Sequence, residues 1–102
     1  MTAPRVGADG PGEVMDDVAN HRFVFAQDGA VAELVYRRNG NRLVLLHTEV
    51  PERLGGRGIG GQLVRAAIER AVAEGLTVVP SCPYARKWLD DHPDVAATVP
   101  LG

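Results

Sequence analysis

Three segments in the first half of the chain are rich in aliphatic, β-branched and aromatic side chains, and short polar stretches separate them. They cover residues 22–26, 30–38 and 42–50. This pattern is typical of strands. The dipeptides Asp28-Gly29 and Asn39-Gly40 separate the three segments, and both favour a tight hairpin turn. The pattern therefore predicts a three-stranded antiparallel meander that stops at Pro51.

The period changes in the second half, where apolar positions recur three and four residues apart. These positions are Leu63, Val64, Ala67, Ile68, Ala71 and Val72. The spacing predicts an amphipathic helix, and Gly75 is a natural end for it. Residues 76–79 predict a short buried strand that Pro80 ends. A second helix is expected to begin at Pro83, since proline suits a first helical turn, and to end at His92-Pro93.

These elements follow the order β-β-β-α-β-α, which indicates a fold of the α/β (α+β) class. A strand, a helix and another strand in succession usually form a right-handed crossover to a parallel neighbour. We therefore expect an antiparallel β-meander joined to one parallel strand through a crossover helix. Ligands of such sheets tend to bind beyond the carboxyl ends of the strands, which here means near Val50 and Ser81.

The chain has 102 residues, a length that fits one domain. Residues 1–18 show no period and hold three glycines, two prolines and scattered acids. We expect them to form a flexible N-terminal lead-in, followed by a single domain over residues 19–102.

Net charge is close to -2, so the chain has no global basic field to attract nucleic acid or an anionic membrane. Cys82 is the only cysteine, which rules out an internal disulfide and fits a reducing compartment. No apolar run resembles a signal peptide or approaches the length of a membrane span. The expected location is cytoplasmic.

Glycines dominate residues 55–61, directly before the first predicted helix. Glycine lets the backbone approach a ligand closely, and the free N–H groups at a helix start favour an anion. A dinucleotide fingerprint would follow the first strand of a βαβ unit, whereas three antiparallel strands precede this turn. A P-loop would end in Gly-Lys-Ser or Gly-Lys-Thr, whereas Gly60-Gly61-Gln62 stands here. A diphosphate-bearing cofactor and a flexible turn without a ligand remain.

Three strings of residues carry a family resemblance. They are His47-Thr48-Glu49-Val50-Pro51, Gly56-Arg57-Gly58-Ile59-Gly60, and the stretch CPYARKWLDDHP over residues 82–93. With them the chain resembles the GNAT superfamily of acetyl-CoA-dependent N-acetyltransferases, and more narrowly its small single-domain branch, over about residues 22–95.

The resemblance implies a fold, a co-substrate and a set of binding residues. Acetyl-CoA would be the co-substrate, its pantetheine amides pairing with the main chain around His47, Thr48, Glu49 and Val50. The loop amides of residues 56–61 (Gly56, Arg57, Gly58, Ile59, Gly60 and Gly61) would hold the pyrophosphate of coenzyme A. Gly55 replaces an arginine or glutamine that is usual in the superfamily, so main-chain amides are expected to do most of this binding.

Four side chains are candidates for the chemistry of acetyl transfer, which needs a neutral amine and a proton for the departing thiolate. Cys82 at a helix start could accept the acetyl group or hydrogen-bond the cofactor sulfur, or could be a small buried apolar residue. His47 and Glu49 share one face of a strand, and either could be the general base or a solvated or main-chain-bonded residue. Tyr84 could be the acid or a packed ring. Trp88-Leu89 stands where many members of the superfamily carry a tyrosine.

Arg86 and Lys87 fall in the first turn of the last predicted helix, an order that opposes the helix dipole. An unfavourable order is tolerated when another contact compensates, so one of them is expected to reach a cofactor phosphate. The other interpretation is a solvated helix face.

Two functions fit these residues. The first is an acetyl-CoA-dependent N-acetyltransferase that acts on a primary amine of a peptide, a protein or a small molecule, by direct attack or through an acetylated Cys82. The second is a coenzyme A-binding module or sensor without amine turnover. The sequence shows no cluster of metal ligands, leaves the amine acceptor and the oligomeric state open, and is compatible with a monomer.

Overall fold

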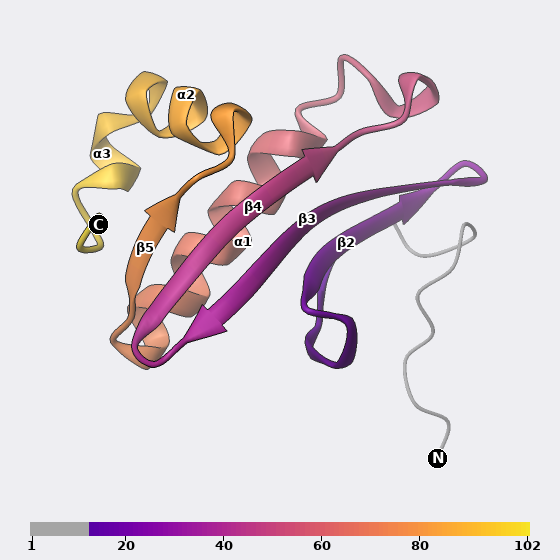
Figure 1. Cartoon of the computed structure of the whole chain (residues 1–102). Helices are drawn as coiled ribbons and strands as arrows, with labels where there is room; N and C mark the ends of the chain where they lie inside the picture. The colour runs from indigo at the N-terminus through magenta and orange to yellow at the C-terminus, as the bar shows by residue number, and fades with distance from the viewer. Residues whose placement is uncertain (1–12) are drawn as a thin grey trace.

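The computed structural model describes residues 13–102, which form one five-stranded sheet with helices on one side (Figure 1). The strands are β1 (Val14–Asp17), β2 (Arg22–Gln27), β3 (Ala30–Asn39), β4 (Arg42–Glu49) and β5 (Thr77–Pro80). The helices are α1 (Ile59–Glu74), α2 (Pro83–Asp91) and α3 (Pro93–Ala96), with short 3₁₀ turns η1 (Val18–Asn20) and η2 (Glu52–Leu54).

The sheet has the predicted mixed topology. Its strand order is β1-β2-β3-β4-β5, antiparallel from β1 to β4 and parallel between β4 and β5. Asp28 and Gly29 both have positive φ angles, of 51° and 77°, as a two-residue hairpin of the type I′ class requires. The predicted α/β (α+β) meander with a crossover helix is confirmed.

Strand β1 corrects the expected lead-in. Val14–Asp17 pairs antiparallel with β2, from Val14 opposite Phe25 to Asp17 opposite Arg22. The prediction of a lead-in through residue 18 is therefore wrong for this segment. Val14 packs against the core, but two consecutive aspartates hide the alternation that marks longer strands. Residues 1–12 lie outside the described part of the chain, so the rest of that prediction stays untested.

Helix α1 covers one face of the sheet (Figure 1) and buries the side chains that its period predicted. Its inward residues meet those of β2, β3 and β4 in a single core. Gly75 ends the helix in the left-handed conformation, with φ of 68°, and its N–H bonds back to Val72. Val72, predicted to be apolar and inward, is instead half exposed.

A polar network of Asp16, Tyr36 and Arg70 joins β1, β3 and α1. The Tyr36 hydroxyl donates to Asp16 over 2.8 Å and accepts from Arg70 over 2.6 Å. Burial, followed by the bond to Asp16, raises the pKa of Tyr36. Hydrogen bonds from Arg70 and Arg38 lower the pKa of Glu74. The network thus ties together three elements that are distant in sequence.

The C-terminal segment extends the helical layer and covers the outer edge of β5. Helix α3 was not predicted; His92-Pro93 ends α2 and immediately begins α3. After α3 the chain returns beside β5, where the Val78 N–H donates to Pro100 and the Gly102 N–H donates to the Val78 carbonyl. No helix among residues 13–102 is long and apolar enough to cross a membrane.

Candidate functional site

A β-bulge in β4 decides which side chains face the site. Val35 of β3 lies opposite His47, but the next residue, Tyr36, lies opposite Leu45, so Leu46 has no partner and the register shifts. Before the bulge, Leu45 is buried in the core; after it, Thr48 points inward and His47 outward. One extra residue therefore inverts the alternation of the strand.

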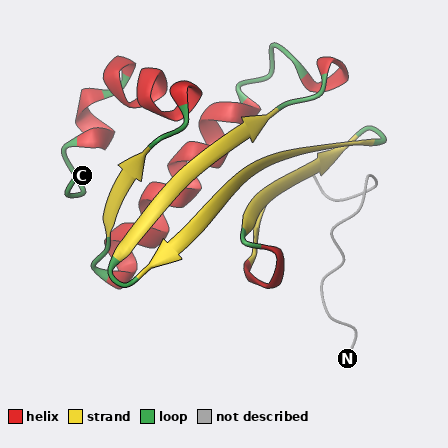
Figure 2. Cartoon of the chain, in the orientation of Figure 1, coloured by secondary structure: helices red, strands yellow, loops and turns green. Residues whose placement is uncertain are grey.

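The strands β4 and β5 separate just beyond the bulge. Their pairing ends at Leu45 opposite Pro80, and the Cys82 N–H makes a last main-chain bond to the Leu45 carbonyl over 2.8 Å. Figure 2 shows the two arrowheads diverging. Along the described chain, no main-chain hydrogen bond joins residues 46–49 to β5 or α2. This stretch of β4 offers an open edge to an extended ligand.

Cys82 closes the narrow end of this opening. Its side chain is only 3% exposed, at the N-cap position of α2. The Thr48 hydroxyl lies 3.3 Å from the Cys82 sulfur, and either group can be the donor. The inverted register after Leu46 is what brings Thr48 to this contact. The structure thus brings two of the predicted site residues, Thr48 and Cys82, into contact. Cys82 is also buried, as expected if it acts as a small apolar residue.

The glycine loop lies at the wide end of the opening. Leu54, fully buried, anchors the chain directly before the loop. Gly56 and Gly58 adopt left-handed conformations with φ of 76° and 72°, which glycine takes without strain. The first main-chain bond of the helix runs from the Gln62 N–H to the Gly58 carbonyl.

It follows that three amides at the start of α1 have no partner within the helix. They belong to Ile59, Gly60 and Gly61. A hollow of about 220 Å³ opens beside them. Its lining residues are Val50, Leu54, Gly55, Gly56, Gly58, Ile59, Gly60 and Tyr84. Five of the predicted cofactor-binding residues, together with Tyr84, therefore meet in one hollow at the end of β4.

Gly60 and Gly61 have a second reason to be glycine. A Cβ atom on Gly60 would collide with the hydroxyl and ring of Tyr84, and one on Gly61 with the indole nitrogen of Trp88. Both aromatic rings project from α2, so the two glycines let α2 approach α1 closely. The sequence interpretation assigned these glycines to the loop alone and missed their packing role.

The side chains of the loop arginines turn toward the β2–β3 hairpin. Arg57 donates to the Asp28 carboxylate over 2.6 Å and to the Gln27 side chain over 3.0 Å. Arg53 donates to the Asp28 carbonyl over 2.8 Å. Both guanidinium groups thus have protein partners on the hairpin.

Arg86 and Lys87 occupy different flanks of α2. Arg86 donates to the Pro80 carbonyl over 3.0 Å, a contact that compensates for its position near the helix start. Lys87 forms an exposed ion pair with Asp91 over 3.1 Å. Helical spacing places Lys87 on the flank of Tyr84 and Arg86 on another. The two residues therefore differ in their polar partners, although both line one hollow with Ser81, Pro83, Asp90 and Asp91.

His47 and Glu49 lie on one face of β4, as their two-residue spacing predicted, and this is the outer face of the sheet. Their side chains are 61% and 68% exposed, and His47 Nε2 lies 3.6 Å from a Glu49 carboxylate oxygen. They stand on the opposite side of β4 from Thr48 and Cys82. The bulge thus places Thr48 on the inner side of β4, in contact with Cys82 at the start of α2, and His47 and Glu49 on the outer side.

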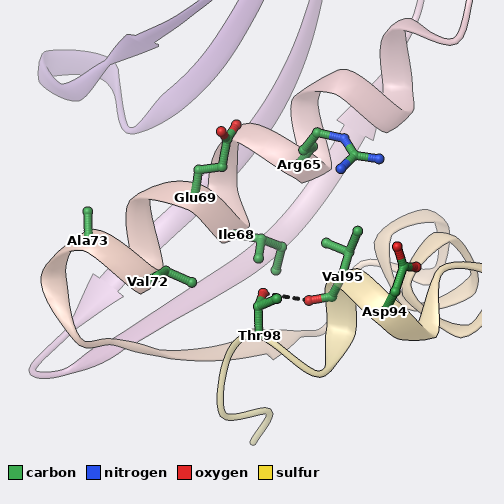
Figure 3. A pocket seen from close by; sticks show the side chains of 8 residues that line it. All are labelled: Arg65, Ile68, Glu69, Val72, Ala73, Asp94, Val95 and Thr98. Atoms are coloured by element: carbon green, nitrogen blue, oxygen red, sulfur yellow. Dashed lines mark hydrogen bonds between the residues drawn. The ribbon is translucent and has the colours of Figure 1, made fainter.

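Another groove lies where α3 packs beside α1 (Figure 3), with apolar residues Ile68, Val72 and Val95 along it. The Thr98 hydroxyl donates to the Val95 carbonyl at its edge, over 2.6 Å. The groove follows the C-terminal half of α1, away from the glycine loop, and no predicted site residue lines it. Within residues 13–102, no group of three or more possible metal ligands comes together.

A family model described as GCN5-related N-acetyl-transferase matches residues 22–99. The chain belongs to the GCN5-related N-acetyltransferase (GNAT) family. The match spans the sheet from β2 onward, the glycine loop and all three helices. The resemblance inferred from the three strings of residues is thus confirmed.

Similar proteins and a solved structure agree with this assignment. The chain is 37% identical to protein NATD1 of Mus musculus over 87 residues, which is 82% of this chain and 79% of the mouse protein. It is 36% identical to protein NATD1 of Gallus gallus over 86 residues, or 81% and 78% of the two chains. A solution structure of a GCN5-like protein from Staphylococcus aureus superposes with a TM-score of 0.69 at 28% identity, covering 86% of this chain and 87% of that one.

Proposed function

We propose that this GNAT-family chain transfers the acetyl group of acetyl-CoA to a primary amine. The observation that carries the proposal is the open edge of β4, which begins at Cys82 and ends at the glycine-loop hollow. An extended arm ending in a diphosphate fits such a track, because main-chain groups line its length and free amides stand at one end.

The residues present fit coenzyme A, which would supply the activated acetyl group as a thioester. The amides of Ile59, Gly60 and Gly61 would hold an anion, since they have no competing partner in the helix. Gly56 and Gly58 leave open space where other residues would place a Cβ atom. The main chain of residues 46–49 keeps free groups for the amides of the arm.

In the proposed reaction the outer pair, His47 and Glu49, and the inner pair, Thr48 and Cys82, have different tasks. His47 and Glu49 are exposed and take a proton from the incoming amine, directly or through water. The amine nitrogen then bonds to the thioester carbonyl carbon as the carbon–sulfur bond breaks. The Cys82 thiol or the Thr48 hydroxyl, in contact on the inner side, gives a proton to the departing sulfur.

Direct attack is proposed over an acetylated Cys82, because that sulfur is buried and already contacts Thr48. A cytoplasmic location is part of the same proposal, and it is supported by a lone buried cysteine that needs no disulfide partner.

A thiol-release assay with acetyl-CoA and a panel of small amines and lysine peptides tests this function. Glu49→Gln should lower kcat/KM by about 10²-fold or more, the usual contribution of a general base, whereas Glu69→Gln on the exposed side of α1 should not change it. Intact mass spectrometry of the protein with acetyl-CoA should show no added acetyl group. A stable acetyl adduct lost in Cys82→Ala would contradict direct attack.

A second candidate is a coenzyme A-binding module without turnover. It is favoured by one observation: neither Trp88 nor Leu89 carries a hydroxyl, and the inner proton donor Cys82 is almost fully buried. Binding of acetyl-CoA without thiol release from any amine of the panel would replace the transferase proposal with this one.

A further inference from the structure

The face of the sheet that points away from the helices is a second surface of the molecule. The buried apolar side chains of the helices belong to one core, on the inner face of the strands, and β4 runs in front of α1 in Figure 1. Arg38 of β3 pairs with Glu74 of α1 and marks the inner side, so Arg37 beside it points outward. Val44 lies opposite Arg37 and shares this outer face. No helix among residues 13–102 packs its apolar side chains on that face.

Apolar side chains form a patch on the outer face, directly beside the proposed base. The bulge inserts Leu46 between buried Leu45 and outward-facing His47, and the Leu46 side chain is 40% exposed. The outer patch consists of Leu46 and three valines of neighbouring strands, Val35, Val44 and Val79. Gly102 lies against the Val79 side chain and bounds the outer patch at β5. The outer patch therefore offers an apolar surface to a ligand whose amine reaches the base.

Two carboxylates stand at one end of the outer patch. Glu49 lies directly opposite Glu33 on the outer face, and like charges in this position destabilise a sheet. Arg22 compensates for Glu33 alone, through a bond of 3.0 Å. Glu49 has only the His47 ring beside it, at 3.6 Å. An ammonium group would offset the remaining repulsion, so this end of the outer face favours a cation.

Two arginines stand at the other end of the outer patch. Arg37 lies opposite Val44, and Arg42 lies opposite Thr77 at the start of β4. Both are exposed, and neither forms an ion pair with another residue of the described chain. Measured along β3, Arg37 is about 7 Å from the level of His47 and about 13 Å from the level of Glu49. This end of the outer face favours an anion.

We propose that the amine acceptor is a small molecule in which an apolar chain or ring joins the primary amine to an anionic group. Its ammonium would lie at His47 and Glu49, its apolar part on the outer patch, and its anion at Arg37. The inference rests on the proposed function, because it names the acceptor of that same transfer. The ammonium gives one proton to His47 or Glu49 before its nitrogen attacks the thioester, and the anionic group is unchanged by the reaction.

The order of charges along the outer face separates this class from two others. A polyamine would place its second ammonium beside Arg37 and Arg42, where like charges repel. A simple alkylamine would use the outer patch but leave both arginines without an anion. Three amines of equal length therefore distinguish the classes: 8-aminooctanoate, octylamine and 1,8-diaminooctane differ only in the group at the far end.

Thiol release from acetyl-CoA with these three amines tests the proposal. For the wild-type protein, kcat/KM should be highest for 8-aminooctanoate, about 5-fold lower for octylamine, as expected for one exposed charge pair, and lowest for 1,8-diaminooctane. Arg37→Gln should abolish the preference for 8-aminooctanoate over octylamine, mainly through a higher KM, and should leave octylamine unchanged. Arg38→Gln is the matched control, since it removes the same charge one residue away on the inner side, and it should keep the preference.

Leu46→Ala tests the apolar part of the assignment separately. It should raise KM for 8-aminooctanoate and octylamine alike, by about 3-fold or more, and keep the ratio between them. Equal kcat/KM for the three amines, a preference that survives Arg37→Gln, or thiol release from lysine peptides alone would overturn this inference and leave the transferase in place. No thiol release with any amine or peptide would overturn the proposed function as well.

Discussion

Replacement of Gly61 by alanine tests whether close helix packing requires a glycine at this position. The new Cβ atom would lie 3.2 and 3.3 Å from the Cε2 and Cδ1 atoms of Trp88, and closer still to its ring nitrogen. The indole has little room to retreat, because His92 stacks on it with ring centroids 3.9 Å apart. The Arg65 guanidinium carbon lies 5.4 Å from the ring centroid. The clash must therefore displace the ring or separate the two helices.

The cost of this clash follows from two opposing effects. Overpacking in a filled site destabilises by about 1–3 kcal/mol, while exchange of glycine for alanine in a helix returns up to about 1 kcal/mol. We expect Gly61→Ala to lower the free energy of unfolding by about 1–2 kcal/mol.

Gly58→Ala is the matched control within the same loop. Gly58 has a φ of 72° and no heavy atom within 4 Å of an added Cβ. Its replacement costs about 1–2 kcal/mol of backbone strain, less about 0.4–1 kcal/mol from a stiffer unfolded chain. The two variants are thus similar in stability but differ in whether Trp88 moves.

Tryptophan fluorescence separates the two variants, because Trp88 is the only tryptophan in the chain. Urea unfolding followed by circular dichroism gives the two free energies. Gly61→Ala should shift the emission maximum of the folded protein, and Gly58→Ala should leave it at the wild-type wavelength. A Gly61→Ala protein with wild-type emission and wild-type stability would refute the packing argument.

Three further predictions concern the loop and the polar network. Leu54→Ala should lower the free energy of unfolding by about 2–5 kcal/mol, because it removes a fully buried side chain. In the same urea experiment, Val72→Ala on the exposed side of α1 should change the free energy of unfolding by less than about 0.5 kcal/mol. Arg57→Gln should change the affinity for coenzyme A by less than about 3-fold in calorimetry, because the exposed ion pair with Asp28 is weak and main-chain amides are the proposed ligands of the anion. A loss of affinity of about 100-fold or more would contradict this prediction. The pKa of Glu74 lies below its ordinary value of 4.5. The ionised carboxylate therefore stabilises the fold above pH 4.5, and this contribution is lost as the pH falls through the lowered pKa. In thermal unfolding below about pH 4.5, the stability of Glu74→Gln should depend less steeply on pH than that of the wild-type protein.

The sequence predicted best the elements that end in residues with a strong turn or helix-stop preference. The turn Asp28-Gly29 specifies a hairpin through two positive φ angles, and Gly75 specifies a helix end in the same way. Strand β1 had no such signal: it holds four residues, two of them aspartates, and it is stabilised by pairing with β2. Tertiary contacts override local preference in such short segments.

The candidate site was predictable in composition but not in its division into faces. The sequence located the glycine loop, Cys82 and the pair His47 and Glu49. It did not predict the contact between Thr48 and Cys82, because a bulge at Leu46 has no residue signature in this strand. Leu54 was also missed as a lining residue, although an apolar residue between Pro51 and Gly55 is a signal that the loop is anchored.

The contacts of the two basic residues of α2, Arg86 and Lys87, were also not predictable from the sequence. The dipole argument predicted a cofactor phosphate as the partner of Arg86 or Lys87, and in the structure Arg86 donates to a carbonyl of its own chain and Lys87 pairs with Asp91. Only side-chain direction separates the two residues, and direction follows from helix position relative to the sheet.

The bulge at Leu46 has a consequence for how β4 can change over evolutionary time. Substitutions between Leu45 and Glu49 alter one side chain at a time and leave the two faces in place. Deletion of Leu46 would restore regular pairing with β3 and leave His47 opposite Val35 and Thr48 opposite Leu34, so both side chains would keep their faces. In a library of single-residue deletions across this segment, loss of Leu46 should therefore be tolerated, whereas loss of Thr48 should remove the contact with Cys82.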